Sequence, residues 1–284
     1  PGYIQVEVTS EDRSVVSWSP MDQFIQDIVR EAGEAIEPLY QHSCVTHTKD
    51  GEHDVVTEAD RVSNEILLRR IKETYPEHGI VSEELPEDEW ETDKEYVWVL
   101  DPLDGTKPFS VGWPMFAVMA ALEHKGEVML GAMYFPMTHE MLFAKKGSGA
   151  FLNGQLVTTS TRKDIRGSFG MFTTGYRDWA SEAERERRTR FLFNVLMNRD
   201  ILGNYMWCIC MSVKALAEGK IDWLSVGGKW WDVAPSKVIL EEAGCKVTNG
   251  DGGDLVLNDF KGILAASPIL HPQLCELLGL DRKT

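Results

Sequence analysis

The apolar positions along the chain follow a helical period up to about residue 75 and a period close to two after it. Apolar residues at positions 24, 25, 28 and 29 follow Ser19-Pro20 and predict a capped helix that runs to about Glu37, just before Pro38. A second helix is expected to open at Thr57. Asp60 would lie in its first turn, where the helix dipole favours a carboxylate.

Short apolar runs then predict strands, at residues 79–82, 96–100, 116–122, 128–135 and 141–144. Asn153-Gly154 predicts a tight turn. Later helices are expected at 186–197, 212–218 and 231–243, the last two closed by glycine. Helices, then a strand meander, then alternating helix and strand indicate an α+β half joined to an α/β half. We therefore predict two parts, residues 1–165 and 166–284.

The acidic composition limits the kinds of partner that the chain can bind. A formal net charge of −16 over 284 residues argues against a nucleic-acid polymer, which requires clustered Lys and Arg. It permits a small anionic substrate, provided that cations neutralise the carboxylates of the site. No run of about 20 apolar residues indicates a membrane span. The first residues also lack the basic-then-apolar pattern of a signal peptide.

The five cysteines form no C-x-x-C pair and show no regular disulfide spacing. This pattern favours reduced thiols in a cytoplasmic protein. Cys208 and Cys210 are spaced to share a face of a strand, but no His or further Cys lies near them in the sequence to complete a zinc site. We expect them to be small buried residues.

The most informative segment is the apolar run 97–100 followed by Asp101-Pro102-Leu103-Asp104-Gly105-Thr106. Strand ends present functional groups on a rigid scaffold, so the two carboxylates and the carbonyl of Leu103 can share a divalent cation. Such hard oxygen ligands suit Mg²⁺ or Mn²⁺ better than zinc. Gly105 lets the backbone approach an anion, so the N–H groups of Gly105 and Thr106 can hold a phosphate oxygen. Taken alone, the same segment is also compatible with a turn that binds nothing.

Other acidic segments accompany this one and together resemble the inositol monophosphatase family. The matching segments are Asp54 to Asp60, Glu83-Glu84, Asp101 to Thr106 and Trp231-Asp232-Val233-Ala234, with lesser matches at 147–154 and 241–244. They occur in the expected order over roughly residues 20 to 280. The resemblance implies a layered αβαβα sandwich of the inositol monophosphatase and fructose-1,6-bisphosphatase type. It also implies a magnesium-dependent, often lithium-sensitive phosphomonoesterase that is commonly dimeric.

The resemblance also implies roles for individual residues. A first metal would bind Glu83, Asp101 and the carbonyl of Leu103, and a second would bind Asp101, Asp104 and Asp232. A looser third ion would lie by Glu83, with Lys49 near that outer site. Glu83, Thr106 and Asp60 would orient and deprotonate the attacking water, and Mn²⁺ could replace Mg²⁺ while Li⁺ or Ca²⁺ inhibits. The substrate pocket would include Asp104, Gly105, Thr106, Ser225 and Ile209.

Two departures from the family pattern affect the expected substrate. Trp207-Cys208-Ile209-Cys210 stands where family members often carry small residues, and Trp207 either reshapes the pocket or fills the core. Ser225 stands where inositol-specific members tend to hold a glutamate that grips two hydroxyls. Loss of such a group changes specificity without abolishing hydrolysis. Inositol 1-phosphate is therefore in doubt as the substrate.

Several alternatives remain open from the sequence. Lys107-Pro108-Phe109 resembles the branch that removes a 3′-phosphate from adenosine bisphosphates, and fructose-1,6-bisphosphate and histidinol phosphate are handled by similar chains. A second phosphate would need Lys145, Lys146, Lys229 and Arg177 to be gathered by the fold, so a monophosphate is favoured. A glycosidase using Asp101 and Asp104 would need no metal. A non-catalytic binder of a phosphorylated ligand is the remaining alternative.

Overall fold

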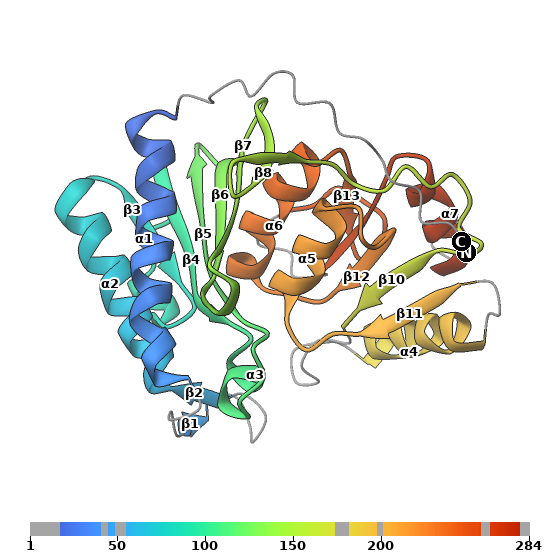
Figure 1. Cartoon of the computed structure of the whole chain (residues 1–284), viewed down its shortest axis with the longest axis horizontal. Helices are drawn as coiled ribbons and strands as arrows, with labels where there is room; N and C mark the ends of the chain where they lie inside the picture. The colour runs from blue at the N-terminus through green and yellow to red at the C-terminus, as the bar shows by residue number, and fades with distance from the viewer. Residues whose placement is uncertain are drawn as a thin grey trace, which may run out of the picture.

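The computed structural model describes residues 18–40, 45–48, 55–173, 182–197, 201–256 and 262–278. Two β-sheets alternate with three layers of helices (Figure 1). Helices α1 (Pro20–Ile36) and α2 (Glu58–Thr74) cover the outer face of the larger sheet, and α5 (Ile209–Ala217) and α6 (Trp230–Glu242) lie between the sheets. Helices α4 (Glu182–Met197) and α7 (Leu270–Leu278) cover the outer face of the smaller sheet. The αβαβα sandwich implied by the resemblance is confirmed.

The larger sheet has seven strands in the order β3-β4-β5-β6-β7-β8-β9, with only the β3–β4 pair parallel. The strands are β3 (Gly79–Ser82), β4 (Tyr96–Asp104), β5 (Ala117–His124), β6 (Glu127–Phe135), β7 (Glu140–Lys145), β8 (Gly149–Leu152) and β9 (Gln155–Val157). Asn153 and Gly154 join β8 to β9 with positive φ at both positions, as the sequence predicted.

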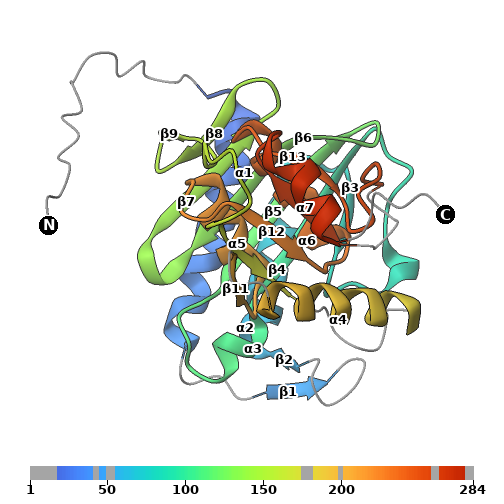
Figure 2. The ribbon, with the colours of Figure 1, turned by 90° about the vertical axis from the view of Figure 1, so that its right-hand side faces the viewer.

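The smaller sheet has five strands in the order β11-β10-β12-β14-β13. The strands are β10 (Phe169–Phe172), β11 (Leu202–Tyr205), β12 (Trp223–Val226), β13 (Lys246–Asn249) and β14 (Ile263–Ala266). A separate pair, β1 (Val45–Thr48) and β2 (Val55–Thr57), lies beside the short helix α3 (Thr106–Ser110) at one end of the molecule (Figures 1 and 2). Short 3₁₀ turns occur at Glu37–Leu39, Glu87–Glu89 and Pro136–Thr138.

The strands of the larger sheet are apolar on both faces because both faces are covered. In β4, Trp98 and Leu100 pack with α1 and α2, whereas Val97 and Val99 pack with α5 and α6. Because successive side chains of a strand point to opposite faces of the sheet, one continuous apolar segment contributes to two separate cores. A third, smaller core lies between the second sheet and helices α4 and α7.

Helix α6 lies close against the larger sheet because β6 carries a glycine where the two meet. A Cβ atom at Gly131 would stand 2.6 Å from Cγ1 of Val238 and 2.9 Å from the carbonyl oxygen of Pro235. Such a separation is shorter than any ordinary contact, so a larger residue would push the helix outward. This close packing fixes α6, and with it the carboxylate of Asp232 in its first turn.

The predicted elements are confirmed in type, with two shifted helix boundaries. The helix expected from residue 186 begins at Glu182, and the one expected from residue 212 begins at Ile209. The chain crosses between the sheets in the segment that joins β9 to β10, where the boundary at residue 165 was placed. The division into two parts stays a prediction. Among the described helices, none is long and apolar enough to cross a membrane.

A buried acid on β5 is held by helix α6. Glu123 is 3% exposed, and its Oε1 accepts a hydrogen bond from Nε1 of Trp230 at 2.6 Å. Burial raises the pKa of Glu123 from 4.5 to about 7, although the Trp230 bond acts in the opposite direction. The folded protein therefore binds a proton here that the unfolded chain releases above about pH 4.5.

This acid makes stability depend on pH. Because the folded pKa exceeds the unfolded one, the contribution of Glu123 is complete below about pH 4.5 and is lost as the pH rises through about 7. Chemical unfolding of Glu123→Gln should show a gain over the parent of about 2–3 kcal/mol at pH 8 that is smaller at pH 5. The exposed Glu89→Gln is the matched control. If the free energy of unfolding changed with pH in the same way for Glu123→Gln and for the parent, the raised pKa of Glu123 would be contradicted.

Candidate active site

The two acids of the Asp101–Asp104 segment point to one site because β4 contains a β-bulge. Asp101 pairs with Met119 and Asp104 with Ala117, so three steps along β4 oppose two steps along β5. In a regular strand, residues three apart face opposite sides of the sheet. The extra residue reverses this relation and brings both carboxylates to the same side.

The bulge is held by short polar contacts. The N–H of Leu103 donates to Oδ1 of Asp101 at 3.0 Å, and the hydroxyl of Ser63 on α2 donates to the carbonyl of Pro102 at 2.6 Å. Ser63 and Asp101 are both buried. Helix α2 therefore secures the backbone between the two acids from the outer side of the sheet.

Two helix N-termini complete the acidic group. Asp104 accepts the N–H of Ile209 at 3.3 Å and that of Cys210 at 2.6 Å, at the start of α5. Asp232 accepts the N–H of Lys229 at 2.6 Å, at the start of α6. Free N–H groups and the helix dipole both favour a negative charge at these positions.

The carboxylates of Asp101, Asp104 and Asp232 converge, with oxygen atoms that all lie within 4.8 Å of one another. Desolvation raises the pKa of all three, and the charges of Glu83 and Asp232 raise that of Asp101 further. The charges of Asp104 and Glu83 act in the same way on Asp232. Glu83 is therefore part of the same electrostatic group, although its oxygens are outside the 4.8 Å set.

This donor set fits a divalent cation with a preference for oxygen. The close carboxylates repel one another when ionised, and a cation of charge +2 removes that repulsion. Asp101 and Asp104 are buried, whereas Asp232 keeps partial exposure to solvent, which leaves a route to the group. Oxygen ligands of this kind match Mg²⁺ or Mn²⁺.

A hydroxyl–carboxylate pair stands next to the acids. The hydroxyl of Thr106 lies 3.0 Å from Oδ1 of Asp60 and 3.0 Å from the carbonyl of Leu103, so its single hydrogen serves one of them at a time. Asp60 also accepts the N–H and the hydroxyl of Thr57. Burial raises the pKa of Asp60 to about 6, against the effect of the Thr57 bonds.

Gly105 gives the backbone its sharp change of direction after β4. Its φ is 94°, and a Cβ atom there would lie 2.5 Å from the carbonyl oxygen of Met115. Both the left-handed conformation and the lack of space require glycine. The turn places Thr106 at the first position of α3, facing Asp60.

Known proteins share both the sequence pattern and the fold. The profile of the inositol monophosphatase family matches residues 17–280. The chain is 32% identical over 251 residues to Nus factor SuhB of Vibrio cholerae, covering 88% of this chain and 92% of that protein. It is 28% identical over 263 residues to an inositol monophosphatase of Dictyostelium discoideum, covering 91% of this chain and 96% of that one.

Among solved structures, extragenic suppressor protein suhB from Bartonella henselae superposes with a TM-score of 0.83 at 26% identity. The match covers 94% of this chain and 100% of the other. The chain belongs to the inositol monophosphatase family. Members of this family are metal-dependent phosphomonoesterases, and the Asp101, Asp104 and Asp232 group has the chemistry that such a site requires.

Other residues that the family resemblance singled out are placed apart from this group or outside the described residues. Ser225 is half-buried in β12, and no described side-chain contact links it to the acids. Ile209 contributes its backbone N–H to Asp104. Lys49 and Asp54 lie outside the described residues.

The Trp207 to Cys210 segment differs from what its sequence indicated. Trp207 is 53% exposed and packs edge-on against Tyr205, so of the two alternatives for this residue the one in which it fills the core is wrong. Cys208 and Cys210 are buried as predicted, but they begin helix α5 and do not lie on a strand. The reason is tertiary, because Asp104 accepts the first free N–H groups of that helix.

The sequence analysis named Thr57 as a helix start but not as a partner of Asp60, and it missed Ser63 and the relation of Cys208 and Cys210 to Asp104. Thr57 had a readable signal, since Thr57 and Asp60 have the spacing of a capping box. Ser63 and the cysteines had none, because their partners lie 39 to 106 positions away in the chain.

The cations considered for a second phosphate are not brought together by any described contact. Lys145 pairs with Asp22 at 2.8 Å, and Lys146 pairs with Glu127. Lys229 lies over the ring of Trp231. Arg177 is outside the described residues.

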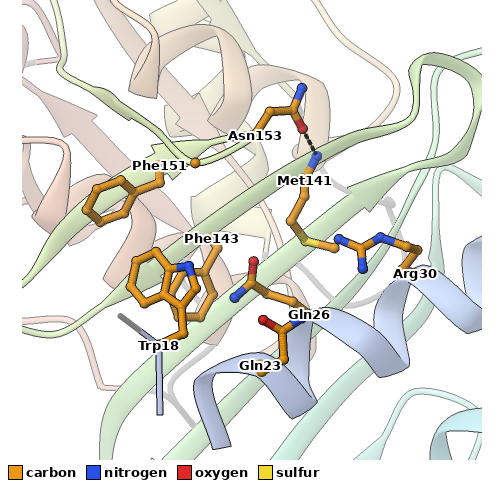
Figure 3. Close-up of a pocket in the computed structure, with 9 residues that line it drawn as sticks. Trp18, Gln23, Gln26, Arg30, Met141, Phe143, Phe151 and Asn153 are labelled. Carbon is orange, nitrogen blue, oxygen red and sulfur yellow. Dashed lines mark hydrogen bonds between the residues drawn. The ribbon is translucent and has the colours of Figure 1, made fainter. Parts of the chain in front are cut away.

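A separate cavity of about 300 Å³ lies between α1 and the β7–β8 hairpin (Figure 3). Its lining combines aromatic rings with amides and Arg30, and the residues are Trp18, Gln23, Gln26, Arg30, Met141, Phe143, Phe151, Asn153 and Gly154. None of the predicted site residues belongs to it. The chemistry of this family therefore has to be sought at the acidic group.

The acidic group predicts a linkage between metal and stability. Mg²⁺ at 100 times its Kd should raise the free energy of unfolding of the parent by about 2.7 kcal/mol. Asp101→Asn should stabilise the chelated protein near neutral pH, because it removes one of the repelling charges, and should lose most of the Mg²⁺ effect. Thermal unfolding with Mg²⁺ and with chelator measures both. The exposed Glu65→Gln is the control, and an unchanged Mg²⁺ response in Asp101→Asn would refute the ligand role.

Proposed function

We propose that this protein is a Mg²⁺-dependent phosphomonoesterase that hydrolyses a small phosphorylated metabolite to an alcohol and inorganic phosphate. One observation carries the proposal. The carboxylates of Asp101, Asp104 and Asp232 converge, and the turn at Gly105 places Thr106 within hydrogen-bonding distance of Asp60 next to them. The family and the relative named inositol monophosphatase support the same reaction class.

In this proposal, Glu83, Asp101 and the Leu103 carbonyl hold a first ion, and Asp101, Asp104 and Asp232 hold a second. A looser third ion would lie by Glu83, near Lys49. Magnesium bound there would lower the pKa of the attacking water and neutralise charge on the phosphate. Mn²⁺ should be able to replace Mg²⁺. Li⁺ or Ca²⁺ should inhibit hydrolysis, because either ion would occupy the ligands of a Mg²⁺ ion without activating the water in the same way.

The protein's own groups would orient the water and take its proton. With its hydrogen directed to Oδ1 of Asp60, the Thr106 oxygen can accept a hydrogen bond from water. A pKa of about 6 leaves Asp60 mostly ionised at neutral pH, so it can receive a proton through Thr106. Glu83 would orient the same water. The water oxygen then forms the new bond to phosphorus as the ester P–O bond breaks. The proton of the water passes through Thr106 to Asp60, and the leaving oxygen takes up a proton from a solvent water molecule.

The N–H groups of Gly105 and Thr106 would hold the phosphate, with Asp104 at the edge of the pocket. Gly105 carries no side chain that could block this approach. Ile209 and Ser225 are the positions proposed to contact the rest of the substrate. We expect no covalent phosphoenzyme, because Asp101 and Asp104 are engaged by backbone N–H groups and by the proposed ions.

Substrates with one phosphate are favoured, of the inositol phosphate, sugar phosphate or histidinol phosphate class. The engagement of Lys145 and Lys146 by acids argues against a second phosphate site. The match to bisphosphate nucleotidases rests on Lys107-Pro108-Phe109, where Pro108 and Phe109 are buried in the fold. Packing therefore explains that match without a role in recognition, and the nucleotidase and fructose-1,6-bisphosphatase activities rank second.

A non-catalytic binder of a phosphorylated ligand is the competing function. The name Nus factor SuhB, carried by several relatives, specifies no phosphatase activity for those proteins. In this chain, however, every acid proposed as a ligand is present, and Asp60 and Thr106 are within hydrogen-bonding distance. Turnover is the measurement that separates the two functions.

We also propose a homodimer. Exposed apolar side chains occur on the adjoining elements α4 and β11, at Phe193, Met197, Leu202 and Tyr205. Burial of exposed apolar side chains such as these would favour association of two copies.

Phosphate release from a panel of phosphomonoesters tests the reaction class. The panel contains inositol 1-phosphate, histidinol phosphate, sugar phosphates, fructose-1,6-bisphosphate and adenosine 3′,5′-bisphosphate, each with Mg²⁺ and with chelator. Release should require Mg²⁺, be greatest for a monophosphate, and fall by several decades in Asp101→Asn. Hydrolysis that survives chelation would exclude the proposed chemistry, and binding without turnover would support the non-catalytic alternative.

Thr106 provides a sharper test of the proton route. Thr106→Val keeps the shape of the side chain and removes the hydroxyl, so kcat should fall by about 10²- to 10⁴-fold with a smaller change in KM. Thr106→Ser restores the hydroxyl and should recover much of the rate. Ser110→Ala, on the same helix, is the control, since the Ser110 hydroxyl donates to the carbonyl of Lys107 within that helix. If kcat were equal for Thr106→Val and Thr106→Ser, the hydroxyl of Thr106 would have no part in the proton transfer.

A further inference from the structure

Two buried thiols stand beside one of the proposed magnesium ligands. The sulfur atoms of Cys208 and Cys210 and a carboxylate oxygen of Asp104 all lie within 4.8 Å of one another. Cys208 is 2% exposed, Cys210 is 0% exposed and Asp104 is 8% exposed. The sequence showed no third ligand near the cysteines, because Asp104 comes from a strand more than 100 positions earlier.

The start of α5 builds this arrangement. Cys208 is the N-cap residue with an extended backbone, at φ −138° and ψ 151°, and Cys210 is the second residue of the helix. The N–H groups of Ile209 and Cys210 hold the two oxygens of Asp104. The carboxylate is thereby fixed against the same turn that presents both sulfur atoms.

We propose that Cys208, Cys210 and Asp104 form a binding site for one thiophilic divalent cation of the Zn²⁺ or Cd²⁺ class. Two sulfurs and one carboxylate oxygen are a donor set that such ions prefer and that Mg²⁺ avoids. A tetrahedral ion needs donors roughly 3.5–3.8 Å apart, so each pair of donors in the observed group, which lie within 4.8 Å of one another, has to close by about 1.3 Å at most. The fourth position is left for water, and both thiol protons are released on binding.

The site goes beyond the proposed phosphatase and would oppose it. Asp104 belongs to the thiol group and also to the group with Asp101 and Asp232. A soft ion that takes Asp104 therefore removes a ligand from the hard-ion site. By linkage, Mg²⁺ must weaken the binding of the soft ion by the same factor as the soft ion weakens that of Mg²⁺. The result is a site at which a thiophilic ion inhibits the proposed hydrolysis, because its sulfur ligands bind soft ions in preference to Mg²⁺.

Cadmium titration of the full chain after chelation tests the proposal. One equivalent should bind with a thiolate-to-cadmium charge-transfer band in the ultraviolet. Cys208→Ala and Cys210→Ala should each weaken binding by about 100-fold or more and lose most of the band. Cys245→Ala and Cys275→Ala, which remove other buried free cysteines, are the matched controls and should bind normally. Added Mg²⁺ should raise the apparent Kd for Cd²⁺.

Cadmium NMR of the parent protein gives a readout that needs no variant, because the chemical shift reports the number of sulfur ligands. Two sulfurs are expected. Any of three results would overturn the proposal. They are a charge-transfer band that is unchanged in both cysteine variants, a cadmium chemical shift that indicates no sulfur ligand, and an apparent Kd for Cd²⁺ that does not change when Mg²⁺ is added. These measurements do not involve hydrolysis. A protein that binds Cd²⁺ as expected but releases no phosphate would therefore fail only the phosphatase proposal.

Discussion

The burial of three close carboxylates, those of Asp101, Asp104 and Asp232, is the constraint on which the site depends. Desolvation raises the pKa of all three acids, and the charges of neighbouring carboxylates raise those of Asp101 and Asp232 further, so the group destabilises the metal-free fold. The surrounding structure compensates by pointing backbone N–H groups at them from Leu103, Ile209, Cys210 and Lys229. A divalent cation, as in the proposed function, would complete this compensation.

The architecture supplies these groups from three directions. The bulge in β4 presents two acids from the larger sheet, and α6, packed against Gly131, presents the third from the layer between the sheets. The third contribution comes from helix α5, whose N-terminal Cys210 N–H donates a hydrogen bond to Asp104. The site therefore lies where the packed layers meet, and it requires the larger sheet and the helices of the second half of the chain to be in place together.

Asp104 has an unusual position in this arrangement, because hard and soft ligands meet at one carboxylate. Asp104 lies within 4.8 Å of oxygen atoms of Asp101 and Asp232 and also within 4.8 Å of the sulfur atoms of Cys208 and Cys210. Small side chains at 208 and 210 would offer only the magnesium chemistry of the family. The cysteines give this chain a second way to engage the same acid, and hence a means by which metal availability can influence activity.

The sequence by itself predicted the elements, the family and the acids that we propose as ligands. Local signals were enough for the capped start of α1, the Asn153-Gly154 turn and the apolar strand that ends at Asp101, since each depends on neighbouring residues. The tertiary structure decided what those signals could not contain. The bulge that turns Asp101 and Asp104 to one side is set by pairing with β5, and the early start of α5 is set by Asp104. The exposure of Trp207 and the meeting of Asp104 with two thiols likewise depend on contacts between residues far apart in the chain, which a local pattern does not encode.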